Sequence, residues 1–306
     1  MNLERWDTSV VAYQMAISSE GLSMALPLLG TLAFGAQRLL PVIQQAYSSW
    51  SVIKGGIKSL EELLILLDQS VANFEEIKQD SIVFNKEIIF DNISYGYGAC
   101  SEYVIKDLSF KIHKGARIGI VGSTGEGKST LLDLLTGLLK PNKGSIKVDD
   151  LYLTDQNHQL WLRHIAQVPQ FIYLIDGTVE ENIAYGESIN EIDRQSLMLA
   201  ALQAQISKDI ESWPLGYNTR VGENGIQLSG GQRQRIGIAR ALYKKAEVII
   251  LDEATSALDS HTESEVVNAI NSINKNITLI IVTHGISTLS NCSEIYKLEN
   301  KKLIKQ

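Results

Sequence analysis

The segment GSTGEGKS, residues 122–129, constrains the fold of this chain more than any other stretch. It matches G-x-x-x-x-G-K-[ST] at every fixed position, with the apolar run RIGIV before it and the helix-like run STLLDLLTGLL after it. Glycines let a backbone wrap closely around a phosphate and turn its N–H groups inward. Because such a loop lies between a buried strand and a helix, the segment predicts an α/β fold with a phosphate-binding loop.

This phosphate-binding loop assigns roles to several residues. We expect Lys128 to neutralise β- and γ-phosphate charge, and the Ser129 hydroxyl to join the shell of a magnesium ion. The other residues expected to line the phosphates are Gly122, Ser123, Thr124, Gly125, Glu126, Gly127 and Thr130. The alternative is a chance glycine-rich turn, which the flanking strand and helix disfavour.

The run VIILDE, residues 248–253, ends a predicted buried strand with two carboxylates. An enzyme with a phosphate-binding loop needs an aspartate on a second strand to hold magnesium, and we assign this role to Asp252. Glu253 would then orient or deprotonate the attacking water. An acidic pair that caps a helix is the alternative.

Other short apolar runs extend this pattern along the chain. The runs IIFDNISYGY, LSFKIHKGARIGIVG and NITLIIVTH are typical of strands, and residues 178–212 are predicted to form a long helical stretch. Strands that alternate with helices imply an α/β layer around a parallel sheet.

Charge and cysteine content exclude some classes of function. The formal net charge is −7, from 28 basic and 35 acidic residues, so charge does not favour nucleic acid as a partner. We interpret the arginines in residues 233–240 as a solvated helix face. Cys100 and Cys292 form neither a disulfide framework nor a CxxC metal pattern, and we expect reduced thiols in a cytosolic setting.

The N-terminal part has a different composition. No charge occurs between Gly21 and Gln37, and Arg38 is the only charged residue between Gly21 and Lys54. This stretch is long enough for a membrane span of roughly 20 residues, and the basic residues that follow it would place its C-terminal end on the cytoplasmic side. The alternative is a buried helix of a soluble domain. A helix over residues 21–67 would be roughly 70 Å long, since each residue adds 1.5 Å.

Residues 227–232, QLSGGQ, also suit a helix N-terminus, where free backbone N–H groups can hold an anion. The order GSTGEGKST, VPQ, LSGGQ, VIILDE, SALD, VTH resembles that of the ATP-binding cassette (ABC) proteins. The resemblance covers roughly residues 86–306 as a complete nucleotide-binding domain. It implies a P-loop NTPase fold with a RecA-like core, an antiparallel β subdomain and a helical subdomain at about 171–238. Residues 1–70 would then be a partial transmembrane domain, and residues 71–85 a linker.

The resemblance also implies a second phosphate cradle that acts on a partner. In the family, two such domains pair head to tail, as a homodimer or a heterodimer, and ATP with Mg²⁺ lies between the phosphate-binding loop of one and the LSGGQ of the other. Ser229, Gly230, Gly231 and Gln232 would hold the ATP of the partner domain.

Single residues carry over in the same way. Tyr97 resembles the aromatic that stacks on adenine, with Tyr95 as the competing choice. Gln170 resembles the loop glutamine that touches magnesium and senses the membrane part. Asp259 resembles the residue that communicates across the dimer, and His284 resembles the switch histidine that contacts the γ-phosphate. The expected catalytic residues are Glu253, His284 and Lys128.

The segments DGTVEENIAYG and GYNTRVGENGIQLSGGQ resemble the exporter branch of the family. They imply an ATP-hydrolysing subunit at the cell membrane that powers export or flipping of a substrate, such as a lipid or lipid-linked oligosaccharide, with its nucleotide-binding domain on the cytoplasmic side. Exporters of this kind normally have six membrane helices, so we expect a fragment, a split gene product or a truncated gene model. The alternatives are a soluble non-transport ABC ATPase and an ATP-binding module without transport activity.

Overall fold

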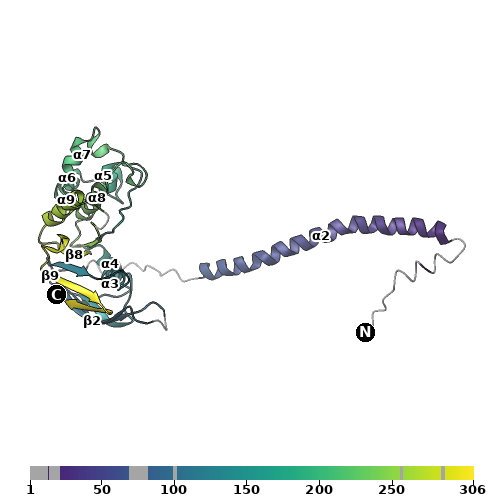
Figure 1. The fold of residues 1–306 in the computed structure, drawn as a ribbon, viewed down its shortest axis with the longest axis horizontal. Coiled ribbons are helices and arrows are strands. Elements are labelled where there is room, and N and C mark those ends of the chain that lie inside the picture. Colours follow the sequence, from purple (N-terminus) through teal and green to yellow (C-terminus); the bar gives the residue numbers. More distant parts are fainter. Residues whose placement is uncertain (1–12, 14–20, 69–81, 99–101, 256–257, 284–286) are drawn as a thin grey trace. The chain divides into compact units, whose positions relative to one another are not determined.

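The computed structural model describes residues 13, 21–68, 82–98, 102–255, 258–283 and 287–306 of the chain (Figure 1). The chain divides into two compact units, Met1–Glu75 and Glu76–Gln306. The described part of the first unit is dominated by one long helix, whereas both sheets lie in the second.

Helix α2, Gly21–Leu67, is continuous over 47 residues, so the long helix expected from the sequence is present. Pro27 and Pro41 lie inside it, where each removes a backbone hydrogen-bond donor. In the described residues, no helix combines the length and the apolar character that a membrane crossing requires.

The smaller sheet of the second unit is antiparallel, with the strand order β2-β1-β4-β5. Its strands are β1 (Glu87–Tyr95), β2 (Ile105–His113), β4 (Lys143–Val148) and β5 (Leu151–Tyr152). Leu108, Phe110 and Ile112 alternate with exposed residues along β2, which is the pattern of a sheet with one buried face. Phe90 of β1 is opposite Phe110, and their stacked rings are 4.4 Å apart.

The larger sheet has the order β10-β9-β3-β8-β7-β6 and is parallel except for its edge pair β9 and β10. Its strands are β3 (Arg117–Val121), β6 (Ile165–Val168), β7 (Val248–Asp252), β8 (Thr278–Val282), β9 (Glu294–Glu299) and β10 (Lys302–Lys305). Every residue of β8 is buried, as expected for a parallel strand that is covered on both faces. The parallel core and the antiparallel subdomain expected from the sequence are both present.

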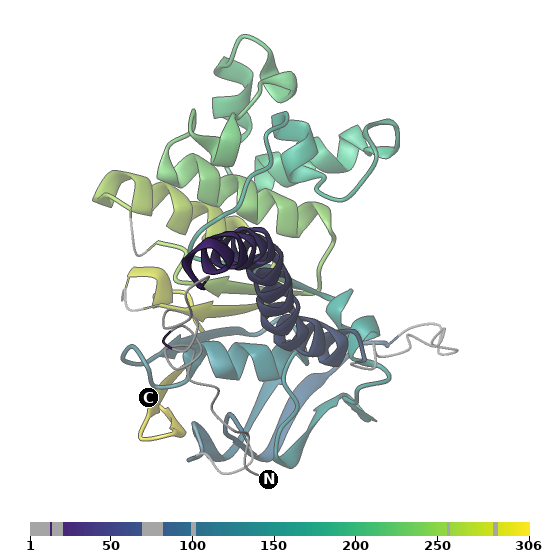
Figure 2. The ribbon, with the colours of Figure 1, turned by 90° about the vertical axis from the view of Figure 1, so that its right-hand side faces the viewer.

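The helices of the second unit are α3 (Lys128–Thr136), α4 (His158–Leu162), α5 (Val179–Ile183), α6 (Arg194–Gln203), α7 (Ser207–Ser212), α8 (Gly230–Tyr243) and α9 (Ser260–Ser272). Short 3₁₀ turns occupy Ile189–Glu191, Gly216–Asn218, Glu223–Gly225 and Ser287–Leu289. Alternate residues of β7 belong to two apolar clusters. Ile249 and Leu251 pack with the helical side, and Val248 and Ile250 pack with α3 and the smaller sheet. Figure 2 shows these two sides above and below the larger sheet.

The predicted helical stretch at 178–212 is broken into α5, α6 and α7. Gly186 has a φ of 95°, and Gln205 has a φ of 57°, so the backbone turns between the helices. The Asp193 side chain accepts hydrogen bonds from two backbone N–H groups at the start of α6. Local turn and capping residues therefore override the apolar pattern over this range.

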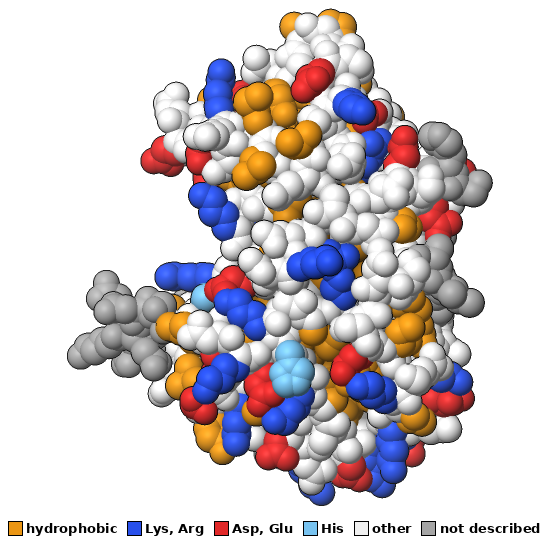
Figure 3. Space-filling view, turned by 90° about the vertical axis from the view of Figure 1, so that its left-hand side faces the viewer, with side chains coloured by type: hydrophobic (Ala, Val, Ile, Leu, Met, Phe, Trp, Pro, Cys, Tyr) orange, Lys and Arg blue, Asp and Glu red, His pale blue; other side chains and the backbone are white. Residues whose placement is uncertain are grey.

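The interpretation of the arginines as a solvated face is wrong for Arg235, whose exposed fraction is 5%. Its guanidinium pairs with Asp209 and Glu265 at 3.0 and 3.1 Å. Figure 3 shows a face of the molecule on which other Lys and Arg side chains are interspersed with Asp and Glu. Arg235 is instead part of the contact between α7, α8 and α9.

Candidate functional site

The phosphate-binding loop joins the end of β3 to the start of α3, as expected from the sequence. Gly125 and Gly127 have φ values of 87° and 99°, which favour glycine because its backbone has no Cβ to clash. A Cβ on Gly127 would also lie 2.9 Å from Cγ1 of Val104. The glycines are therefore required by the backbone path of the loop itself.

Lys128 links the phosphate-binding loop to the acidic residues at the end of β7. Its side chain is 8% exposed, and its Nζ donates a hydrogen bond to the Gly122 carbonyl at 2.6 Å. The same Nζ lies 3.6 Å from Oε1 of Glu253. The structure thus brings a loop lysine and a strand-end glutamate together from positions far apart in the sequence.

The acidic pair lies at the carboxyl end of β7, two strands from β3 in the sheet. Burial raises the pKa of the Asp252 carboxyl, and the neighbouring charge of Glu253 raises it further, whereas Lys128 opposes both. Glu253 has a φ of 49°, and its backbone N–H donates to the Val282 carbonyl at 2.8 Å. A non-glycine residue held in this region is under strain, which is common at functional sites.

The two candidate adenine-stacking residues differ in exposure. Tyr95 is 9% exposed and packs in the core, whereas Tyr97 is 53% exposed. Their rings meet edge to face at 5.2 Å, and the Tyr97 hydroxyl is 3.1 Å from Oγ1 of Thr130 on α3. Only an exposed ring can accept a stacked base, so the geometry favours Tyr97.

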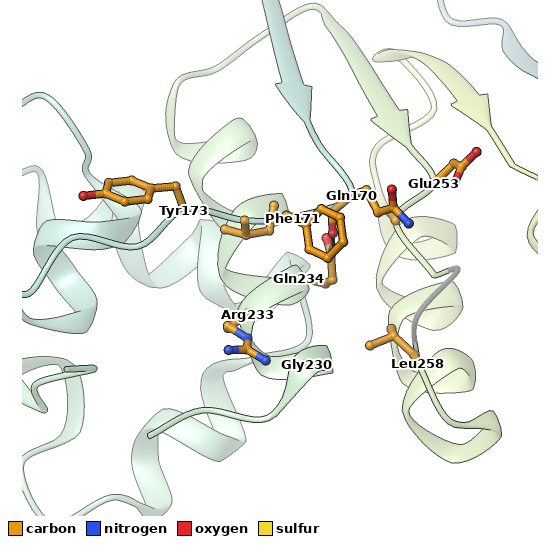
Figure 4. Close-up of a pocket in the computed structure, with 10 residues that line it drawn as sticks. Gln170, Phe171, Tyr173, Gly230, Arg233, Gln234, Glu253 and Leu258 are labelled. Carbon is orange, nitrogen blue, oxygen red and sulfur yellow. Dashed lines mark hydrogen bonds between the residues drawn. The ribbon is translucent and has the colours of Figure 1, made fainter. Parts of the chain in front are cut away.

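Gln170 follows β6 and lines a cavity of about 400 Å³ together with Glu253, Gly230 and Leu258. Figure 4 shows Gln170 and Glu253 extending from the ends of neighbouring strands, with Gly230 and Arg233 on α8. Nε2 of Gln234 donates to the Gln170 backbone carbonyl at 2.6 Å, so α8 holds the loop that carries Gln170.

Ser229 is the N-cap of α8, as the sequence pattern suggested. Its Oγ accepts a hydrogen bond from the backbone N–H of Gln232 at 3.2 Å, and the Gln232 side chain accepts from the Ser229 backbone N–H at 3.0 Å. This reciprocal pair is a capping box. The Ser229 side chain is exposed at the start of the helix.

The glycines of this motif have a second role that the sequence did not reveal. A Cβ on Gly231 would lie 2.1 Å from Cγ2 of Thr262, and a Cβ on Gly230 would lie 2.9 Å from a methyl carbon of Leu258. The start of α8 therefore packs against the segment around α9 more closely than a larger residue allows. Close packing of helices explains these glycines without any ligand.

Asp259 and His284 are two further predicted residues, and the structure describes only the first of them. Both carboxylate oxygens of Asp259 accept hydrogen bonds from Thr262, from its backbone N–H at 3.1 Å and its hydroxyl at 2.7 Å. Asp259 thus caps the first turn of α9. His284 lies outside the described residues.

The carboxylates at the end of β7 suit a magnesium ion that is bound together with phosphate. In the part of the chain that the structure describes, no group of three or more His, Cys, Asp or Glu side chains could hold a metal ion. Asp252 and Glu253 place two carboxylates close together with Lys128 as a nearby cation. Mg²⁺ is typically bound by one or two carboxylates with substrate phosphates and water, which fits this arrangement.

Comparisons with known proteins agree with this geometry. Residues 105–256 match the family described as ABC transporter. The ATP-dependent lipid A-core flippase of Idiomarina loihiensis is 35% identical over 100% of this chain and 54% of its own length. The flippase of the same name from Coxiella burnetii is 33% identical over 100% of this chain and 55% of its own length. The chain thus spans about half the length of these relatives.

A solved structure of a bacterial Atm1-family ABC exporter with ATP bound has the same architecture. It has a TM-score of 0.70 and 33% sequence identity, over 82% of this chain and 44% of the exporter chain.

Proposed function

Residues 105–256 belong to the ABC transporter family, and on that premise we propose that this chain is the ATP-binding and ATP-hydrolysing subunit of an exporter-type transporter. The observation that carries the proposal is the approach of Lys128 Nζ to both the Gly122 carbonyl and Glu253. It joins the phosphate-binding loop to the carboxylate that the reaction requires. A triphosphate bound in the loop would have its terminal phosphate near both charges.

Each residue of the site has a proposed task. The backbone of residues 122–127 and the Lys128 ammonium bind the phosphates, and Tyr97 stacks on the adenine. Glu253 orients the attacking water and accepts its proton as the water oxygen bonds to the γ-phosphorus and the bond to the β–γ bridging oxygen breaks, which releases ADP and phosphate. His284 is proposed to contact the same phosphate, and Asp259 to communicate with the partner domain.

Ser129, Gln170 and Asp252 are the residues that would hold Mg²⁺. The ion would neutralise charge on the β- and γ-phosphates during transfer. The half-buried Asp252 carboxyl is well suited to this position, because a cation compensates for the cost of keeping it ionised.

We propose that two nucleotide-binding domains close head to tail around ATP. Ser229 Oγ accepts from Gln232, so its own hydrogen remains available to donate to an acceptor outside the helix. Its exposed position at the start of α8 supports a contact with phosphate held by a partner, as a homodimer or a heterodimer.

The transported substrate is proposed from the relatives. Those compared above are named lipid A-core flippases, so we propose a lipid-like or lipid-linked saccharide substrate. The chain would act at the cell membrane with transmembrane helices of the complete transporter, its nucleotide-binding domain on the cytoplasmic side. Lipid A-core is then expected to accelerate ATP hydrolysis by the bilayer-reconstituted protein, and a rate unchanged by any lipid-linked saccharide would contradict this substrate class.

The hydrolysis proposal is tested with Glu253→Gln in the full chain. Removing a general base is expected to lower the ATPase rate by about 10²–10⁴-fold while ATP-dependent dimers persist. Glu299→Gln, on an exposed carboxylate at the end of β9, is the matched control and should keep the wild-type rate. Hydrolysis by Glu253→Gln at the wild-type rate would refute the assignment.

A further inference from the structure

The Gln232 side chain is held at both ends. Its Oε1 accepts a hydrogen bond from the Ser229 backbone N–H at 3.0 Å, and its Nε2 donates to Oδ1 of Asp209 at 2.9 Å. Asp209 lies on α7 and precedes Gln232 by 23 residues in the sequence. The capping box at the start of α8 is therefore tied to a carboxylate on a different helix.

Asp209 is itself fixed by a buried cation. Its other oxygen, Oδ2, accepts from Nη1 of Arg235 at 3.0 Å. The same Arg235 nitrogen donates to the Gln205 carbonyl at 2.7 Å, and Nη2 lies 3.1 Å from Glu265. The Arg235 side chain is only 6% exposed, so this set of contacts holds the Asp209 carboxylate in one place.

The chemistry of these groups sets the direction of the Gln232 amide. An ionised carboxylate only accepts hydrogen bonds, so the amide NH₂ must face Asp209 and the amide oxygen must face Ser229. In that orientation the amide oxygen satisfies the Ser229 backbone N–H. The Ser229 hydroxyl oxygen is then engaged by the Gln232 backbone N–H, which leaves the hydroxyl hydrogen to donate outward.

We propose that Asp209 is a positioning residue that orients the Gln232 amide and thereby aims the Ser229 hydroxyl at the γ-phosphate of ATP bound by a partner domain. Asp209 touches no nucleotide in this arrangement and acts only through Gln232. The inference rests on the proposed function, which it deepens by naming a residue outside the LSGGQ segment on which that contact depends.

The test exchanges the amide and the carboxylate. In Asp209→Asn, the new NH₂ group must face either the Gln232 amide NH₂ or the Arg235 guanidinium. Both of these groups are themselves donors, so a donor then faces a donor. In Gln232→Glu, two carboxylates face each other. In the double variant Asp209→Asn/Gln232→Glu, the Asn oxygen can accept from Arg235, the Asn NH₂ can donate to the Glu, and the other Glu oxygen can accept from Ser229.

The assay is ATP-dependent dimerisation of the full chain in detergent with Mg·ATP, measured by analytical ultracentrifugation in the Glu253→Gln background. Each single variant is expected to raise the dimer dissociation constant about tenfold or more, and the exchange variant should dimerise at least about threefold more tightly than Gln232→Glu, which carries the same added charge at position 232. Asp209→Asn should keep the ATP affinity of the monomer, because its phosphate-binding loop is unchanged.

Glu265→Gln is the matched control, since it removes a carboxylate from Arg235 without touching Gln232. It is expected to dimerise like the background even where its thermal midpoint falls. Dimerisation of the two single variants at the background level, or a folded exchange variant that stays as weak as Gln232→Glu, would overturn the inference. If a single variant does not fold, the dimer dissociation constant of the exchange variant decides whether the inference stands. Absence of an ATP-dependent dimer in the background itself would instead refute the proposed function.

Discussion

Replacing Gly231 with alanine is expected to destabilise the nucleotide-binding domain through a clash with Thr262. The added Cβ would lie 2.1 Å from Cγ2 of Thr262, well inside the roughly 3.5–4.0 Å that is optimal between carbon atoms. Thr262 cannot rotate away freely, because its hydroxyl donates to Asp259 at 2.7 Å. The methyl group must therefore push α8 away from α9 or break that hydrogen bond.

The magnitude follows from opposing contributions. Overpacking a well-filled contact costs about 1–3 kcal/mol. Alanine in place of glycine within a helix returns up to about 1 kcal/mol, and less near a helix start such as Gly231. The net loss in the free energy of unfolding is about 1–2 kcal/mol, which lowers the thermal midpoint by about 2–8 °C for a domain of this size.

The assay is thermal unfolding of the full chain, followed by tryptophan fluorescence, to which Trp161, fully buried in the second unit, contributes. Thr262→Ser removes Cγ2 and keeps the hydroxyl, so Gly231→Ala/Thr262→Ser should regain most of the lost stability. Thr262→Ser alone is the control and should cost less than about 1.5 kcal/mol. A Gly231→Ala midpoint equal to that of the wild type, or a double variant no better than Gly231→Ala, would refute the reasoning.

Three further predictions address other parts of the domain. Although burial opposes it, hydrogen bonds from the backbone N–H groups of residues 85–87 hold the pKa of Asp149 below its usual value of 3.8. Its stabilising contribution is complete at neutral pH and declines as the pH falls below about 4 toward the folded-state pKa, so Asp149→Asn should cost about 1–2 kcal/mol in urea unfolding at pH 7 and progressively less in acid. Burial raises the pKa of Cys292 to about 11. In a Cys100→Ser background, iodoacetamide at pH 8 should therefore alkylate the folded chain at least about tenfold more slowly than the urea-unfolded chain. Equal rates of alkylation would contradict the burial of this thiol. Gly127→Ala forces a side chain into a φ of 99°, so its ATP affinity by equilibrium dialysis should fall at least about tenfold, and wild-type affinity would show that the loop tolerates this strain.

The candidate site shows how far residue patterns alone reach. The loop at 122–129 and the strand that ends at Asp252 could be located from the sequence, because glycine, lysine and apolar runs determine backbone conformation within a few residues. The N-cap at Ser229 was equally accessible, since a capping box is a contact between residues three positions apart. The choice between Tyr95 and Tyr97 could not be made from the sequence, because the exposure of each ring depends on what packs around the ends of strands.

Two expectations failed because local patterns do not report tertiary surroundings. Arg235 looked like part of a solvated face, yet Asp209 and Glu265 bury it from two other helices. The helical pattern at 178–212 gave no sign of where turns would divide it into three helices.

The sequence by itself determined the local elements of this protein: the phosphate-binding loop, the acidic strand end and the capped start of α8. Only the tertiary structure decided which of these lie together, such as Lys128 beside Glu253, Gln232 bound to Asp209, and Gly231 pressed against Thr262. The physical reason is the range of the interactions. Dihedral preferences and caps act over a few residues, whereas ion pairs, burial and close packing join positions whose separation in the chain carries no signal.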